Sequence, residues 1–100
     1  MARKVVSSTG EAERIRTAKR RMAHEKPTVW VGKSGVTASM VGEIDKQLEK
    51  RGFVKVKVLR SALEEEGVKD IARRIAGETE SRLVDIRGHT FILYRPKKPL

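Results

Sequence analysis

Two glycines three residues apart, Gly32 and Gly35, bracket Lys33 and Ser34. These four residues follow a short apolar run, residues 29–31, and precede a segment with helical periodicity. Glycines let a backbone pass close to a ligand without obstruction by a Cβ atom, and the lysine adds a mobile positive charge. A strand, a glycine loop and a helix in this order are typical of a phosphate-binding element. The phosphate is expected to belong either to a nucleotide or to a nucleic acid.

The residues before the loop disfavour a nucleoside triphosphate. The loop that binds ATP or GTP has the pattern G-x-x-x-x-G-K-[ST], and Pro27 stands where its first glycine is needed. Proline has no N–H to offer and a fixed φ. The apolar run also leads directly into Gly32, so the loop is too short to encircle a triphosphate. A clamp on a sugar-phosphate backbone, of the kind made by the G-x-x-G loop of K-homology domains, is favoured over both a nucleotide site and a turn with no ligand.

The charge of the chain indicates a polyanionic partner. The 100 residues include 23 Lys and Arg against 13 Asp and Glu, which gives a formal net charge of +10. Apolar residues make up 38% of the chain and there are 8 glycines, so the charge has not displaced a core. A phosphate backbone is the commonest partner of a small folded domain with this excess of positive charge.

Other classes of chemistry find little support. The chain has no cysteine, and His24 and His89 lack partners at metal-ligand spacing. No residue set supplies a nucleophile with its base, so we expect no enzyme, no metal, no cofactor and no small-molecule substrate. No apolar run approaches the roughly 20 residues of a membrane span, and the N-terminus lacks a signal-peptide pattern. We therefore expect a cytoplasmic monomer that does not bind membranes.

Periodicity predicts one α+β domain over residues 11–96, between a flexible arm at 1–10 and a basic tail at 97–100. Helices are expected from Glu11, from the N-cap Thr37 to Arg51, and around residues 68–75, with strands at 28–31, 53–59, 82–87 and 90–95. The order is therefore α-β-α-β-α-β-β. Strands joined through a helix should be parallel neighbours, and the last two should form a hairpin across Gly88 and His89. The result is a two-layer fold with a mixed four-stranded sheet and helices mostly on one face.

Basic side chains outside the loop complete the candidate surface. Five lie between residues 14 and 21 with no acidic residue among them, a bias that favours a binding face over an ordinary solvated one. Lys55 and Lys57 alternate with valines and should point away from the helical layer, either as part of this surface or as solvated strand residues. Trp30 is expected in the core rather than stacked on a base, whereas for Tyr94 the two roles are balanced.

Several motifs, in this order, resemble one known family. They are Ala23-His24, Lys26-Pro27, the stretch from Gly32 to Thr37, the strand that begins at Phe53, and Phe91-Ile-Leu-Tyr-Arg-Pro96. Together they are similar to the CRM domain (chloroplast RNA splicing and ribosome maturation), and in particular to the stand-alone YhbY-like proteins of prokaryotes. The resemblance runs from about Glu11 to Pro96. The bacterial proteins carry an extra residue between the His and the Pro, so the turn after His24 should differ here.

The resemblance implies an RNA-binding module with a fold similar to the C-terminal domain of bacterial translation initiation factor three. Stand-alone members of the family are linked to precursors of the large ribosomal subunit. Their G-x-x-G loop maps onto Gly32 and Gly35, and their basic first helix maps onto residues 14–21.

We therefore predict a non-enzymatic protein that binds structured ribosomal RNA during assembly of the large subunit. The alternatives are an architectural DNA-binding protein and an enzyme that uses a phosphorylated small molecule at the glycine loop. The residues predicted to contact RNA are Gly32, Lys33, Ser34, Gly35, Arg14, Arg16, Lys19, Arg20, Arg21, Lys55, Lys57 and Arg95.

Overall fold

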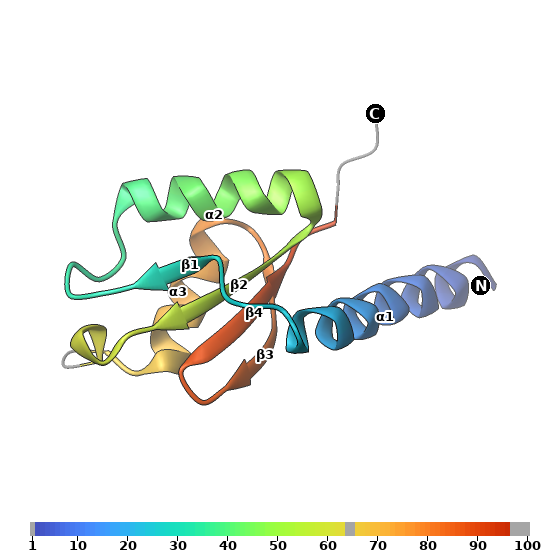
Figure 1. The fold of residues 1–100 in the computed structure, drawn as a ribbon. Helices are drawn as coiled ribbons and strands as arrows, with labels where there is room; N and C mark the ends of the chain where they lie inside the picture. Colours follow the sequence, from blue (N-terminus) through green and yellow to red (C-terminus); the bar gives the residue numbers. More distant parts are fainter. Residues whose placement is uncertain (1, 64–65, 97–100) are drawn as a thin grey trace.

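A computed structural model describes residues 2–63 and 66–96 and shows an α+β fold around a mixed sheet of four strands (Figure 1). The predicted order of elements is confirmed, with one additional 3₁₀ turn. The basic tail predicted at 97–100 lies outside the described residues. The elements are α1 (Ala2–Ala23), β1 (Val29–Val31), α2 (Ala38–Arg51), β2 (Phe53–Val58), η1 (Arg60–Ala62), α3 (Val68–Glu78), β3 (Arg82–Arg87) and β4 (Thr90–Tyr94).

The strands are arranged in the order β1-β2-β4-β3. β1 and β2 are parallel neighbours, as predicted, whereas β4 pairs antiparallel with both β2 and β3. The prediction that β2 and β3 are neighbours is wrong, because β4 lies between them. Hydrophobicity explains the order: Phe91, Ile92, Leu93 and Tyr94 of β4 are all buried, which suits a central strand. β3 is only partly buried along its length, and it forms an edge.

The main core lies between the sheet and the helices α2 and α3. Alternate residues of β2, among them Val54 and Val56, face Ile44 and Leu48 of α2. Ile71 and Ile75 of α3 complete the same cluster, and all are nearly inaccessible to solvent. Burying an aliphatic side chain of this size stabilises a fold by about 1.5–3 kcal/mol. This cluster is therefore the main source of stability.

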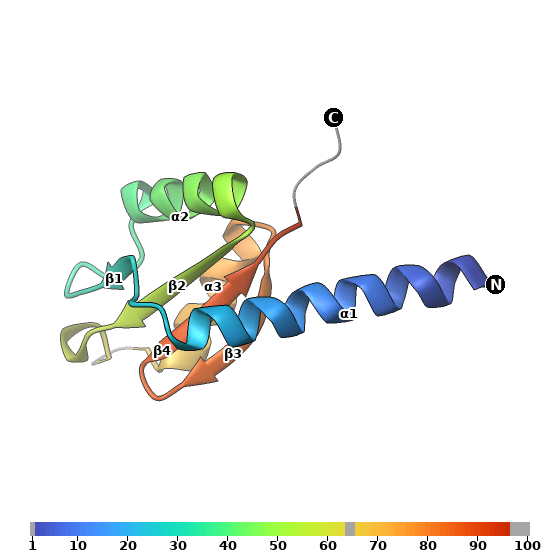
Figure 2. The same ribbon diagram turned by 45° about the vertical axis from the view of Figure 1, so that its right-hand side comes forward.

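Helix α1 lies across the opposite face of the sheet, which makes a third, partial layer (Figure 2). Ala18 and Met22 are buried there, and so are Ile92 and Tyr94, the residues of β4 that point away from the main core. Two of the three helices share one face, as predicted, but this second face is not open. The alternation of β2 and β4 provides apolar residues on both sides, and α1 covers part of the second side.

Residues 2–10, predicted to be a flexible arm, continue α1 as a helix that projects beyond the sheet (Figure 1). Helix elongation needs only one further hydrogen bond for each residue added, and Gly10 disfavours it by only about 1 kcal/mol. The predicted start at Glu11 therefore lies inside the helix. It does not mark where the helix begins.

Capping residues position the elements next to the glycine loop. Thr37 is the N-cap of α2 and its side chain accepts a hydrogen bond from the backbone N–H of Met40 at 3.2 Å. Gly52 ends the helix in the left-handed region, with φ of 85°. Gly88, with φ of 57°, occupies the first central position of the β3–β4 turn. A type II′ hairpin reserves that position for glycine.

Candidate nucleic-acid interface

The loop Gly32–Lys33–Ser34–Gly35 forms a tight turn at the carboxyl end of β1. The N–H of Gly35 donates to the carbonyl oxygen of Gly32 at 2.8 Å. Lys33 and Ser34, at the tip, are both exposed. Val36 and Thr37 then lead into α2, so the turn is separated from the helix by a short link. A four-residue turn of this kind presents backbone and side chains to an anion but does not wrap around a triphosphate.

The structure constrains the two glycines of the loop differently. Gly35 has φ of 70°, a left-handed conformation that favours glycine. At Gly32 an added Cβ would lie 3.8 Å from the Cδ1 atom of Leu59, an ordinary van der Waals contact. Backbone geometry therefore favours a glycine at position 35. At position 32 neither the backbone angle nor the space for a Cβ requires a glycine.

A cavity of about 290 Å³ adjoins the loop. Lys33, Ser34 and Gly35 form one wall, and residues of η1 and α3 form the other. Arg74 of α3 lines the cavity and pairs with Glu66 at 2.9 Å. The pair is largely exposed, so it holds the guanidinium group only weakly beside the loop.

All five predicted basic residues of α1 are exposed, and they surround the helix rather than forming one face. At 100° per residue from the buried side at Ala18 and Met22, Arg16 and Arg20 point outward, while Lys19 and Arg21 lie on opposite flanks. The guanidinium carbon of Arg21 lies 5.7 Å from the ring centre of Phe53. The helix therefore presents positive charge in several directions, and no single groove collects it.

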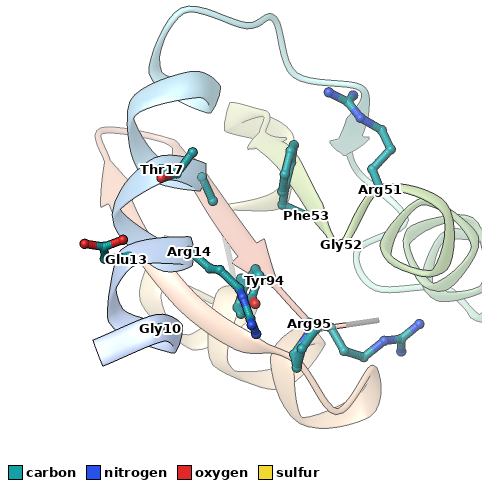
Figure 3. A pocket seen from close by; sticks show the side chains of 11 residues that line it. Gly10, Glu13, Arg14, Thr17, Arg51, Gly52, Phe53, Tyr94 and Arg95 are labelled. Atoms are coloured by element: carbon teal, nitrogen blue, oxygen red, sulfur yellow. The ribbon is translucent and has the colours of Figure 1, made fainter. Parts of the chain in front are cut away.

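Arg14 lines an open cleft of about 690 Å³ between α1 and the start of β2 (Figure 3). Its side chain reaches from the helix toward Tyr94, while Arg95 points away from the cleft. Arg51 borders the same cleft and lies over Phe53, 5.2 Å from the ring centre. Arg51 also pairs with Glu25 at 2.9 Å. Sequence reasoning missed Arg51, which was assigned only to the end of a helix.

Lys55 has neither of the two roles considered for it, an open basic patch or a solvated strand residue, because it is partly buried and bonded within the fold. Its ammonium group donates to the carbonyl oxygens of Met22 and Glu25 at 2.7 and 2.8 Å. These carbonyls end α1 and the turn after it, where a positive charge is favourable. Through these two hydrogen bonds, Lys55 holds the end of α1 on the sheet.

Arg95 is likewise engaged within the fold. It donates to the carboxylate of Asp45 at 2.6 Å and to the carbonyl oxygen of Thr79 at 2.7 Å. These contacts join the end of β4 to α2 and to the end of α3. The prediction that Arg95 contacts RNA conflicts with this arrangement, since only 22% of its side chain is exposed. A carboxylate fifty residues away in the chain gives no local signal of such a pair.

Lys57 remains on an uncovered part of the sheet, together with Trp30. The two residues are register partners across β1 and β2, and both are exposed. Trp30 was expected in the core, but 53% of its surface is exposed. Val29 and Val31, its neighbours in β1, face the main core and are buried. β1 is an edge strand whose main contacts are with β2 and α2, so the outward residue between the two valines stays about half exposed. Tyr94, by contrast, is in the core.

No group of three or more potential metal ligands occurs within residues 2–63 and 66–96. None of the helices described has an apolar stretch long enough to cross a membrane.

Comparison with known proteins places this geometry in context. Residues 11–95 match the model of the CRS1/YhbY (CRM) domain family. The chain is 39% identical over 90 residues to Probable RNA-binding protein MJ0652 of Methanocaldococcus jannaschii, covering 90% of this chain and 65% of that protein. It is 36% identical over 90 residues to Probable RNA-binding protein YqeI of Bacillus subtilis, covering 90% of each. The solution structure of hypothetical protein SAV1595 from Staphylococcus aureus superposes with a TM-score of 0.69 at 29% identity, covering 87% of this chain and 88% of that one.

Proposed function

This chain belongs to the CRS1/YhbY (CRM) domain family, as its motifs predicted, and we propose that it is a non-enzymatic protein that binds RNA through the Gly32–Gly35 loop and the exposed basic side chains of α1. The observation that carries the proposal is the turn itself. It holds Lys33 and Ser34 outward at the end of a strand, in a chain with a net charge of +10. Relatives in an archaeon and a bacterium are named as RNA-binding proteins, which supports RNA as the polyanion.

Structured ribosomal RNA of the assembling large subunit is the partner we propose. The stand-alone CRM proteins that this sequence resembles are linked to large-subunit precursors. Partly double-stranded RNA is recognised mainly by its backbone and shape. A small turn and a helix with arginines on several sides supply contacts of this backbone type, so sequence preference should be modest.

The loop is tested by adding a negative charge without changing its shape. Gly32→Asp and Gly32→Asn are nearly equal in shape and differ by that charge, and the Cβ of either meets only an ordinary contact with Leu59. Fluorescence anisotropy with a structured fragment of large-subunit ribosomal RNA, at two salt concentrations, should show at least a tenfold loss of affinity for Gly32→Asp. The loss for Gly32→Asn should be less than threefold. Equal affinities for the two variants would mean that the loop does not contact phosphate.

Competitors decide between RNA and the other partners considered. Duplex DNA that displaces the RNA as well as unlabelled RNA does, at the same salt, would favour an architectural DNA-binding protein. Displacement by ATP or GTP would favour a site for a phosphorylated small molecule. The proposal requires weak competition by DNA and none by either nucleotide.

A further inference from the structure

Trp30 is the largest apolar side chain exposed in the described part of the chain, and its strand does not need it for packing. Val29 and Val31 supply the apolar contacts of β1, and both are buried. Trp30 points to the other side of the sheet, where 53% of its surface meets solvent. An indole at such a position exposes a flat π-face and contributes little to the core.

Phe53 of β2 is a second aromatic residue on this face, and its ring is more covered than that of Trp30. Phe53 alternates with the buried valines, so it lies on the same side of the sheet as Trp30. It is half-buried, and the guanidinium groups of Arg21 and Arg51 lie 5.7 and 5.2 Å from its ring centre. Helix α1 and the turn after it reach as far as Lys55, which donates to the carbonyl oxygens of Met22 and Glu25. The edge beyond, which includes Trp30, stays uncovered.

Positive charge lies beside this exposed edge. Lys57 lies beside Trp30 in the register of β1 and β2, and it is exposed. Leu59, 39% exposed, donates its N–H to the carbonyl oxygen of Val31 and so continues the same face. Arg60 follows it, and residues 26–42 and 51–63 contain no Asp or Glu. An exposed aromatic face next to a lysine, with no acidic residue in the flanking segments, suits a base attached to a phosphate.

The glycine loop lies next to this edge. Gly32 follows Trp30 by two residues, which is about 7 Å along a strand. A nucleotide whose base lies on the indole therefore has its backbone beside the turn that carries Lys33. The aromatic face and the loop are close enough to contact consecutive parts of one strand.

We propose that Trp30 is a stacking platform for one unpaired nucleobase of RNA, with Lys57 beside it for the phosphate. This inference rests on the proposed RNA binding and adds a preference for single-stranded segments next to structured ones. Base–aromatic stacking is sequence-tolerant, because every base has a π-face. The platform therefore selects unpaired nucleotides and not a particular base.

The chain's single tryptophan makes the test direct, because intrinsic indole fluorescence reports on this position alone. The probes are a fluorescein-labelled RNA hairpin with a ten-nucleotide 3′ overhang of adenosines, and the same hairpin without the overhang. Anisotropy measures binding, and indole emission measures contact with Trp30. The platform predicts quenching by the overhang RNA with the same midpoint as the anisotropy change. It predicts much weaker quenching by the blunt hairpin.

Variants at Trp30 separate aromatic stacking from hydrophobic contact. Trp30→Leu keeps an apolar side chain but removes the π-face, whereas Trp30→Phe keeps a π-face. Affinity for the overhang RNA should fall about 5- to 160-fold in Trp30→Leu, the range measured for base–aromatic stacking. Trp30→Phe should retain most of the affinity, and neither variant should change binding of the blunt hairpin by more than twofold.

The outcomes distinguish failure of the platform from failure of RNA binding. If both RNAs bind, but indole emission and the affinity of Trp30→Leu do not change, the platform is wrong and the proposed function stands. If neither RNA binds, the proposed function is wrong as well. If poly-glutamate, an anion without bases, quenches the indole as strongly as the overhang RNA, the surface binds an acidic protein partner and the platform is overturned.

Discussion

The ammonium group of Lys55 donates to the carbonyl oxygen of Met22 at 2.7 Å, and this contact joins the last turn of α1 to the middle of β2. A side chain of a strand thus completes the end of a helix that lies across the same sheet. Two residues further on, Lys57 has no helix above it and is exposed. Two lysines on the same face of one strand therefore lie in different surroundings, because α1 covers Lys55 but does not extend over Lys57.

Replacing Lys55 by Met should lower the free energy of unfolding by about 1–3 kcal/mol, since the variant cannot make the hydrogen bonds from a charged group to these acceptors. Lys57→Met, on the same face of the same strand, should change it by about 0.5 kcal/mol or less. Urea denaturation of both variants measures the difference. Equal effects would show that the contact with Met22 adds nothing to stability.

Arg95 should act through the fold, and a double-mutant cycle with Asp45 measures its pairing. Half of the Asp45 side chain is exposed, so the coupling free energy should be about 0.5–1 kcal/mol. Arg95→Gln should destabilise the protein more than Asp45→Asn does, because Arg95 also donates to the carbonyl oxygen of Thr79 at 2.7 Å. A folded Arg95→Gln variant that retains full stability but loses RNA affinity would return Arg95 to the RNA-contacting set.

Local patterns in the sequence predicted most of the elements correctly. Thr37 and Gly52 were recognised as caps because their chemistry is local, and the same holds for the turn at Gly88. The strands of the hairpin were predicted on either side of Gly88 and His89. These features depend on a few neighbouring residues and not on how the layers meet.

The arrangement of layers could not be predicted in the same way. Alternation tells which residues of a strand share a face, but not whether a distant helix covers that face. The first helix was predicted from a thin apolar stripe, which gave no indication of which side of the sheet α1 would cover: Ala12, Ile15, Ala18 and Met22. That choice places Lys55 partly under the helix and leaves Trp30 beyond it, so both assignments depended on an arrangement that local patterns do not contain.

The basic side chains of α1 should add affinity that depends on salt. Replacing Arg16, Lys19 and Arg20 together by Gln should reduce the slope of log K against log salt by about 2–3, nearly one for each phosphate that the variant no longer neutralises. Stability should change little, because all three side chains are exposed. Anisotropy titrations of ribosomal RNA at four salt concentrations give the slope.

A matched variant controls for net charge. Lys46, Lys50 and Lys69 are exposed on α2 and α3, on the other side of the sheet, and their replacement by Gln removes the same three charges. This variant should change the slope by less than one. A similar reduction from both triple variants would mean that RNA senses the overall charge of +10 and not the surface of α1.

The two loop glycines should differ in their response to alanine. Gly35 has φ of 70°, so Gly35→Ala forces a Cβ into the left-handed region and should lower the free energy of unfolding by about 1–2 kcal/mol. Gly35→Asn should cost less, because asparagine tolerates this conformation better. Gly32→Ala meets only the ordinary contact with Leu59 and should leave stability within about 0.5 kcal/mol.

Thermal denaturation of the three variants, followed by RNA titration of those that fold, tests both the geometry and its use. If the shape of the turn positions Lys33 for phosphate, both Gly35 variants should bind RNA more weakly than the unaltered chain does. The loss of affinity should be smaller for Gly35→Asn than for Gly35→Ala, because asparagine tolerates the native conformation better. A stable Gly35→Ala variant would mean that the left-handed turn is not required. A destabilised one with unchanged affinity below its melting temperature would mean that the turn serves the fold alone, and the contact with RNA would have to come from α1 and the edge at Trp30.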